Sequence, residues 1–158
     1  MNFLPVYLDS SALLKLVVSE RESSALRGAL AAWPDWVTSR LAAIECQRAV
    51  RRLGRNASLT ARVSHVLATC TMLHLDEPTL RLAEQVGGPH LRSLDAIHLA
   101  AALSMGDHPA AFVTYDERLA AAARACDLSV IAPATSIQAT PAAATSTVSR
   151  QKVRAVAD

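Results

Sequence analysis

The stretch Val6-Tyr7-Leu8-Asp9-Ser10-Ser11 decides the fold that this sequence predicts. An apolar run typical of a buried strand ends in a carboxylate, and two serines then open a helical pattern. In an open α/β sheet, functional groups gather just beyond the carboxyl ends of the strands. Position alone therefore places Asp9 at a functional edge. The question for the rest of the chain is whether other carboxylates meet it there.

Strand and helix patterns alternate along the chain, which predicts an α/β protein with a central, mainly parallel sheet and helices on both faces. The predicted strands cover residues 4–8, 36–38, 73–75, 111–114 and 128–131, and the predicted helices cover residues 12–19, 23–32, 40–53, 58–72, 78–86, 94–105 and 117–126. Helices 40–53 and 58–72 form a hairpin with residues 55–57 as its turn. The predicted caps at helix starts are Ser10 or Ser11, Ser39, Ser93 and Asp116.

The composition predicts one domain and a tail. The chain has 158 residues, of which 51% are hydrophobic and 4% aromatic, enough for a single core rich in Ala, Leu and Val. We expect the domain to cover residues 1–133. From there the composition shifts to Ala, Thr, Ser, Pro and Val without periodicity, which predicts a flexible tail over residues 134–158. No internal repeat is evident.

Cysteine usage and the amino terminus predict a cytoplasmic protein without a membrane segment. The three cysteines form no C-x-x-C pair and lie in apolar helical patterns, as reduced, buried thiols do. The first residues lack a basic n-region, and Pro5 interrupts the apolar run. The formal net charge of +2 resides in residues 138–158, so global charge carries no argument for nucleic acid.

Four acids stand out by their positions: Asp9, Glu45, Asp95 and Asp116. Asp9 ends the first strand, Asp116 follows the strand over residues 111–114, Asp95 lies in the first turn of its helix, and Glu45 lies within a helix beside the apolar stripe. Each also has a purely structural interpretation. Asp9 and Asp116 suit helix caps, Asp95 suits the helix dipole, and Glu45 suits an i,i+3 pair with Arg48.

Convergence of these acids would favour a metal site. Two carboxylates about 5 Å apart at an effective dielectric of about 20 repel by about 3 kcal/mol. Four of them together would take up protons or bind cations. An all-oxygen set without a Cys or His cluster suits Mg²⁺ or Mn²⁺ rather than zinc. Such ions hold phosphates and activate water, so the chemistry predicted is phosphodiester hydrolysis without a covalent enzyme intermediate.

These acids lie in motifs that resemble those of PIN-domain nucleases. The stretch Leu8–Leu16 resembles their opening motif, Glu45 their second acid, Ser93-Leu94-Asp95-Ala96-Ile97-His98 their third, and Val113-Thr114-Tyr115-Asp116 their fourth. The resemblance covers residues 6–133 and is greatest to the single-domain VapC toxins of bacterial toxin–antitoxin pairs. Two features depart from the pattern: the tail, and Cys126-Asp127 where a glycine commonly precedes the last strand.

The resemblance implies a three-layer α/β/α sandwich and a Mg²⁺- or Mn²⁺-dependent endoribonuclease. It also implies a cognate VapB-type antitoxin and a homodimer or toxin–antitoxin hetero-oligomer. Asp9, Glu45, Asp95 and Asp116 would line the metal site, with Ser10 and Thr114 as polar helpers. For His98 we favour a packed histidine bonded to the backbone over a general base.

Local charge suggests how RNA and an antitoxin would bind. The five arginines at positions 40, 48, 51, 52 and 55 lie near a single acid, and a helical wheel places Arg48 and Arg52 beside Glu45 as contacts for the RNA backbone. A solvated helix face is the competing interpretation. We further expect an antitoxin to insert a basic side chain among the acids.

Two other functions remain open. A phosphoacceptor or aspartate phosphatase also combines Mg²⁺ with a strand-end Asp, but Ser11 stands where a phosphatase needs a second Asp. The only lysines, Lys15 and Lys152, lie outside the late strand where a receiver domain needs one. A catalytically inactive PIN relative that binds RNA or protein is the other alternative, although such relatives usually lack one of the acids.

Overall fold

The computed structural model describes residues 4–54 and 56–135. The part of the predicted tail from residue 136 onward and Arg55 of the predicted turn lie outside this range. The elements in chain order are β1 (Val6–Leu8), α1 (Ser10–Val17), α2 (Ser23–Leu30), β2 (Trp36–Ser39), α3 (Arg40–Arg52), α4 (Ala57–Ala68), β3 (Cys70–Leu73), α5 (Glu77–Ala83), α6 (Ser93–Leu103), β4 (Ala111–Val113), α7 (Glu117–Ala125) and β5 (Val130–Ile131).

The five strands form one parallel sheet in the order β3-β2-β1-β4-β5. β1 lies at its centre, where Val6 pairs with Trp36 of β2 and Tyr7 pairs with Phe112 of β4. From β1 the chain adds β2 and then β3 on one side of the sheet, and β4 then pairs with the other side of β1. The carboxyl ends of β1 and β4, followed by Asp9 and Asp116, therefore lie side by side. The predicted parallel sheet is confirmed, and the sequence did not indicate its strand order.

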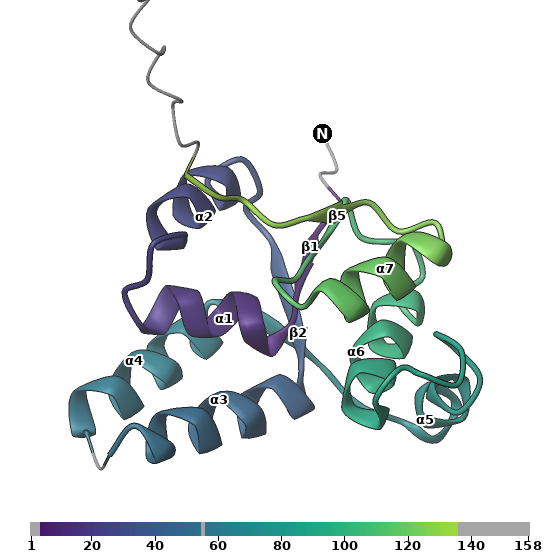
Figure 1. Cartoon of the computed structure of the whole chain (residues 1–158), viewed down its shortest axis with the longest axis horizontal. Helices are drawn as coiled ribbons and strands as arrows, with labels where there is room; N and C mark the ends of the chain where they lie inside the picture. Colours follow the sequence, from purple (N-terminus) through teal and green to yellow (C-terminus); the bar gives the residue numbers. More distant parts are fainter. Residues whose placement is uncertain (1–3, 55, 136–158) are drawn as a thin grey trace, which may run out of the picture.

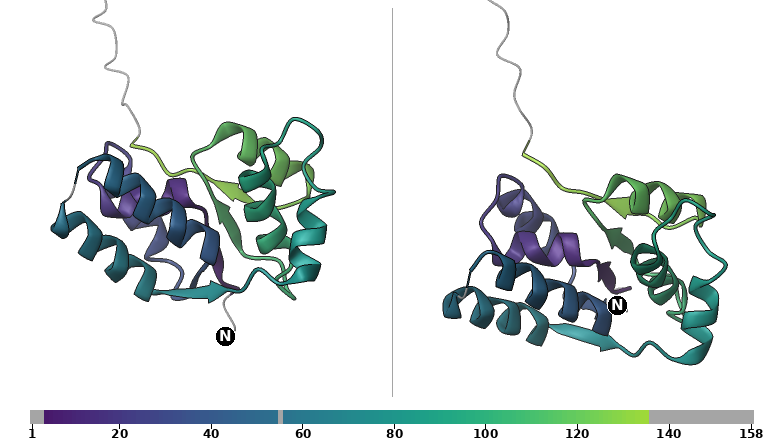
Figure 2. Two further views of the ribbon diagram at one scale, coloured as in Figure 1. Left: turned by 90° about the horizontal axis from the view of Figure 1, so that it is seen from below. Right: turned by 60° about the horizontal axis from the view of Figure 1, so that its bottom comes forward.

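Helices cover both faces of the sheet. Figure 1 shows α1 to α4 on one side of the strands and α5 to α7 on the other, and both views in Figure 2 show the same separation. Two buried clusters match these layers. One joins Val6 and Leu8 to α1 through α4, and the other joins Tyr7 and Phe112 to α6 and α7. Alternate β1 residues enter opposite clusters because successive strand side chains point to opposite faces.

Several predicted caps and boundaries were wrong. Asp9, and neither Ser10 nor Ser11, caps α1, since its side chain accepts from the Ala12 N–H. Ser39 and Arg92 occupy the cap positions of α3 and α6 without a side-chain cap bond. A serine cap was expected because its hydroxyl suits this position, but α1 begins at Ser10, two residues before the predicted start at residue 12.

The boundary between α4 and β3 also differs from the prediction. The helix expected to reach Met72 ends at Ala68, and the strand expected over residues 73–75 covers Cys70–Leu73. This segment pairs along its whole length with β2, from Trp36↔Cys70 to Ser39↔Leu73. Pairing at the edge of the sheet overrides the helical periodicity of the isolated sequence.

Asp127 stands in the turn before β5 with a φ of 60°. That left-handed conformation favours glycine, and Asp is among the few other residues that tolerate it. The glycine missing from the family pattern is therefore replaced by an aspartate in the backbone conformation that glycine prefers.

All three cysteines are free, as predicted, although only Cys46 is fully buried. No helix in the described part of the chain is long and apolar enough to span a membrane.

Candidate active site

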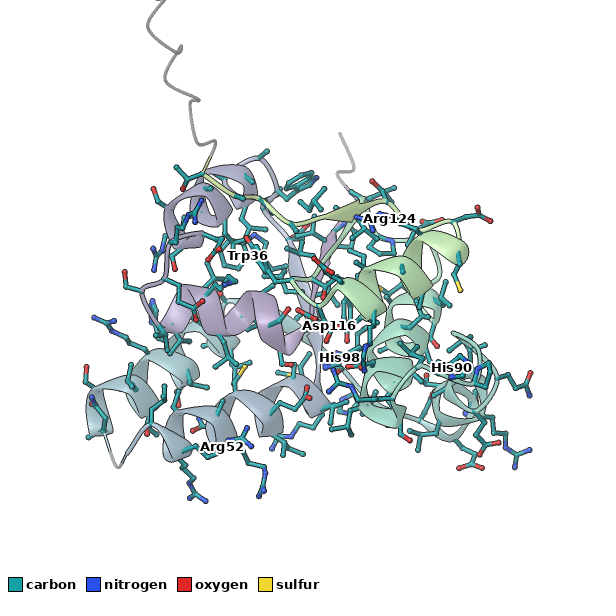
Figure 3. The ribbon with its side chains drawn as sticks, viewed as in Figure 1. Trp36, Arg52, His90, His98, Asp116 and Arg124 are labelled. Carbon is teal, nitrogen blue, oxygen red and sulfur yellow. The ribbon has the colours of Figure 1, made fainter. Side chains whose placement is uncertain are left out.

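A cavity of about 290 Å³ opens at the carboxyl ends of β1 and β4. All four predicted acids line it, although they lie far apart in the sequence. Its lining residues are Asp9, Ser10, Ser11, Glu45, Arg92, Ser93, Leu94, Asp95, His98 and Asp116. Figure 3 shows His98 and Asp116 near the middle of the molecule, between the two helical layers.

Asp9 is the most buried of the acids, with a residue exposure of 2%. Its Oδ1 accepts from the Ala12 amide at 2.9 Å and the Ser11 hydroxyl at 2.7 Å, and its Oδ2 accepts from the Thr114 hydroxyl at 2.6 Å. Burial nevertheless raises the pKa of Asp9, because these hydrogen bonds only partly offset desolvation. Asp9 is thus both a helix cap and a carboxylate whose ionised form gains from a nearby cation.

Thr114 and Ser11 connect the ends of β1 and β4. The Thr114 hydroxyl, which is fully buried, donates to Asp9 and accepts from the Asp116 amide at 3.1 Å. The Ser11 hydroxyl donates to Asp9 and accepts from the Tyr115 amide at 2.8 Å. Thr114 was predicted as a helper, whereas sequence reasoning assigned Ser11 only a capping role. The Asp-Ser-Ser order was the available signal, since it puts a hydroxyl two residues beyond the strand-end acid.

Glu45 is held by a buried histidine. The Glu45 Oε2 lies 2.6 Å from His98 Nε2, and the Tyr7 hydroxyl lies 2.9 Å from His98 Nδ1. Tyr7 and His98 are 0% and 1% exposed. The prediction of a packed histidine was right, but its bond to the backbone was wrong. Both ring nitrogens bond to side chains, because α6 presents His98 to α3 on one side and β1 on the other.

The His98 contact also changes the electrostatics of Glu45. Burial acts to raise the pKa of Glu45, but the hydrogen bond and charge of His98, together with the Ser10 hydroxyl and Arg92, lower the pKa overall. Within the described residues the ion-pair partner of Glu45 is His98, and the alternative pair with Arg48 does not form.

A single arginine bridges the other two acids. Arg92 Nε lies 3.0 Å from Asp95 Oδ2, and Arg92 Nη2 lies 2.9 Å from Asp116 Oδ2. The remaining oxygen of Asp116, Oδ1, caps α7 by accepting from the Arg118 and Leu119 amides. Sequence reasoning did not identify Arg92, although its place three residues before Asp95 was a usable signal.

Arg48 and Arg52, predicted beside Glu45, do not line this cavity. Arg48 lines a separate groove between α3 and α4. Figure 3 shows Arg52 toward the far end of α3, away from His98 and Asp116. Lys15, the only lysine before the tail, is held by Glu20 and Glu22 and also does not line the cavity. A receiver-type site, which needs a lysine beside the acid, finds no support here.

The chemistry of the donor set fits a hard divalent cation. Carboxylates and hydroxyls line the cavity, and Mg²⁺ and Mn²⁺ prefer such oxygen ligands. Across residues 4–54 and 56–135, however, no three His, Cys, Asp or Glu side chains are arranged to hold one ion together. Arg92 and His98 engage three of the four carboxylates, each through one oxygen, so an ion at this edge would share these carboxylates with them or replace one of the contacts.

A parallel sheet with four acids gathered at its carboxyl edge is the arrangement of a PIN domain. The sequence matches the model of that family over residues 6–125. The chain is 45% identical over 123 residues to Ribonuclease VapC47 of Mycobacterium tuberculosis (strain CDC 1551 / Oshkosh), covering 75% of this chain and 90% of that protein. Its identity to Ribonuclease VapC46 of strain ATCC 25618 / H37Rv is 42% over 128 residues, covering 81% and 97%. The chain therefore belongs to the PIN-domain family, among the VapC ribonucleases.

Solved structures agree on the fold. VapBC2 from Rickettsia felis, crystallised with a DNA fragment from its promoter, matches with a TM-score of 0.67 at 10% identity, covering 82% of this chain and 99% of that chain. At this identity the match concerns the fold alone. The family and fold that the sequence motifs implied are thereby confirmed.

Proposed function

We propose that this chain is a divalent-metal-dependent endoribonuclease and the toxin of a type II toxin–antitoxin pair. The observation that carries the proposal is the cavity that gathers Asp9, Glu45, Asp95 and Asp116 in a chain closely related to VapC ribonucleases. These acids, at the carboxyl edge of a parallel sheet, occupy the place where α/β folds bind ligands.

The four acids are the proposed metal ligands, and Mg²⁺ or Mn²⁺ is the proposed ion. When bound, such an ion would hold the scissile phosphate and make water a better nucleophile. The chain's own residues prepare the site. Thr114 and Ser11 fix the Asp9 carboxylate, and His98 fixes Glu45. Ser10 lies beside Glu45 and keeps its helper role as a proposal.

Charge distribution supports RNA as the substrate and suggests its path. Residues 36–75 contain six arginines and one acid, whereas residues 76–135 contain four arginines and eight acids. Arg40, Arg48 and Arg51 line the groove between α3 and α4, which measures about 560 Å³. The phosphates of RNA would bind most favourably beside the arginine-rich segment of residues 36–75. We propose that the RNA backbone approaches the acids along α3, with Arg48 and Arg52 among its contacts.

An antitoxin and a second copy of the chain are the proposed protein partners. A basic antitoxin side chain would neutralise the acids of the cavity as a cation does. Ile44 on α3 and Leu53, the residue that follows α3, are 53% and 63% exposed and offer apolar surface for contact with a partner. Saturating amounts of antitoxin should abolish cleavage, and undiminished cleavage would reject this form of inhibition.

Free thiols at all three cysteines agree with the cytoplasm as the site of action.

Cleavage of a mixed RNA pool by the full chain tests the enzymatic proposal. Mg²⁺ or Mn²⁺ should support cleavage, EDTA should abolish it, and Asp95→Asn should reduce it by about 100-fold or more. Asp107→Asn changes an exposed aspartate outside the cavity and should cleave like the wild type. Cleavage that survives both EDTA and Asp95→Asn would reject the proposal.

A further inference from the structure

Arg92 is the basic side chain of the cavity. It immediately precedes α6, and it is the only arginine or lysine among the lining residues. Its guanidinium contacts Asp95 and Asp116 at once, using Nε for one carboxylate and Nη2 for the other. These two acids come from different elements, so Arg92 links the start of α6 to the end of β4. This arginine bridge, the pair of contacts from Arg92 to Asp95 and Asp116, uses two of the carboxylates proposed to bind the divalent ion.

The bridge is built so that it can open. The Arg92 side chain is 62% exposed, whereas the Asp95 and Asp116 side chains are 15% and 28% exposed. No other hydrogen bond or ion pair to the Arg92 side chain is found in the described part of the structure. Water can solvate the guanidinium when it leaves, and ion pairs at such exposure are weak and sensitive to salt. The two acids, by contrast, cannot leave the cavity without disturbing α6 and the α7 cap.

We propose that Arg92 is an exchangeable internal counter-ion that becomes a substrate-binding residue. In the metal-free chain its single positive charge is shared between Asp95 and Asp116. When a divalent ion takes these carboxylates, the guanidinium is released at the mouth of the cavity and binds a phosphate of the RNA. A planar guanidinium suits this second role, because it contacts phosphate oxygens through two parallel hydrogen bonds. This inference rests on the proposed ribonuclease function.

The two roles predict opposite effects of one substitution. The bridge competes with the ion, so removing the guanidinium should strengthen metal binding. If the bridge were open about one-tenth of the time, its removal would strengthen the apparent metal affinity about tenfold. The same substitution removes a phosphate contact, so it should weaken RNA binding. A residue that merely supported the fold would weaken both.

The test compares Mn²⁺ binding and RNA kinetics in the full chain. In calorimetry at 50 mM NaCl, Arg92→Gln should bind Mn²⁺ about 3–10 times more tightly than the wild type. This difference should shrink at 500 mM NaCl as the ion pairs are screened. With Mn²⁺ saturating, KM for the RNA should rise about fivefold or more, while kcat changes less.

Two further variants serve as controls, with folding checked by circular dichroism. Arg92→Lys keeps the charge and should retain near-wild-type Mn²⁺ affinity while losing part of the RNA affinity. Arg81→Gln breaks an exposed pair with Glu77 on α5, outside the cavity, and should leave both quantities within about twofold. Equal or weaker Mn²⁺ binding by Arg92→Gln, or an unchanged KM, would overturn the proposal. The Mn²⁺ titration needs no cleavage, so its result stands even if the chain fails to cut RNA.

Discussion

Replacing Tyr7 with phenylalanine isolates the buried hydrogen bonds behind Glu45. The Tyr7 ring stacks on Phe112, with centroids 5.2 Å apart and an interplanar angle of 9°. Phenylalanine keeps this ring and creates no cavity larger than the lost oxygen. The substitution therefore removes the contact to His98 Nδ1 and the interaction of the same hydroxyl with the buried Ser39 hydroxyl.

The cost follows from the burial of His98, which is 1% exposed. Loss of the hydroxyl leaves Nδ1 without a partner, and a buried unsatisfied group costs about 1–3 kcal/mol. Part of that cost is regained because the tyrosine hydroxyl no longer has to be buried. We therefore expect a loss of about 1–2 kcal/mol in the free energy of unfolding, or about 3–6 °C in Tm for a domain of this size.

Glu45 should respond as well. The Tyr7 hydroxyl bonds to Nδ1 of His98 and the Glu45 carboxylate accepts from Nε2, so Tyr7 helps to hold the ring in the orientation that serves Glu45. Without the hydroxyl, the His98 ring loses one of its two side-chain partners, and only the Glu45 carboxylate, which accepts from Nε2, still orients it. Glu45 is one of the proposed metal ligands, and loss of a direct partner of a metal ligand typically costs about 10–100-fold in metal affinity. Tyr7 is one residue further away, so Mn²⁺ binding should weaken on the order of threefold.

Urea unfolding, calorimetry with Mn²⁺ and ¹⁵N chemical shifts of the His98 ring measure these effects. Tyr115→Phe is the matched control, because its hydroxyl donates to the Pro133 carbonyl and Tyr115 does not line the cavity. It should cost less than about 1 kcal/mol and leave Mn²⁺ affinity unchanged. A Tyr7→Phe variant within about 0.3 kcal/mol of the wild type, with unaltered ring shifts, would refute the reasoning.

Two more predictions concern groups whose pKa the fold raises. Because burial raises the pKa of Asp9, the native chain binds its proton more tightly than the unfolded chain, so stability should fall as pH rises through the range above the ordinary aspartate value. In EDTA at pH 7.5, Asp9→Asn should thus be more stable than the wild type by on the order of 1 kcal/mol in urea unfolding, and a less stable variant would contradict this. Burial raises the pKa of the Cys46 thiol to about 12, with Glu45 and Asp9 adding to the effect, so about one thiol in 10⁴ is ionised at pH 8. Mass spectrometry after treatment with a disulfide reagent should find Cys126 modified and Cys46 intact in the native chain, and rapid modification of Cys46 would show that it is accessible.

The sequence was sufficient to predict which acids meet. Asp9 and Asp116 each follow a strand, and parallel strands end at one edge of a sheet. Asp95 begins a helix, and Glu45 lies one turn into another. For Glu45 the alternation of elements accounts for this placement, because a helix that follows a parallel strand begins at the carboxyl edge of the sheet. Asp95 lies on α6, which follows α5 rather than a strand, so its place was indicated by the resemblance of its motif to PIN-domain nucleases. A shared edge does not by itself make Asp9 and Asp116 neighbours, which also requires β1 and β4 to be adjacent in the sheet, and the sequence did not indicate that order.

The partners of these acids were harder to predict. A helical wheel describes one helix in isolation, so it placed Arg48 and Arg52 next to Glu45. Along the axis Arg52 is about 10 Å further on, since each residue rises about 1.5 Å. The actual partner, His98, comes from α6, and only the packing of α6 against α3 and β1 brings it there.

The arrangement of counter-charges argues that the site is prepared for a cation. The carboxylates have three different kinds of partner: hydroxyls and an amide donate hydrogen bonds to Asp9, a buried histidine contacts Glu45, and an exposed arginine pairs with Asp95 and Asp116. The hydroxyl network and the histidine are fixed by the core, so an incoming ion cannot displace them cheaply. Arg92 alone is largely solvated, so its exchange for a divalent ion disturbs the fold least. The same solvation leaves it free to meet a phosphate afterward, which joins metal binding and substrate binding in one side chain.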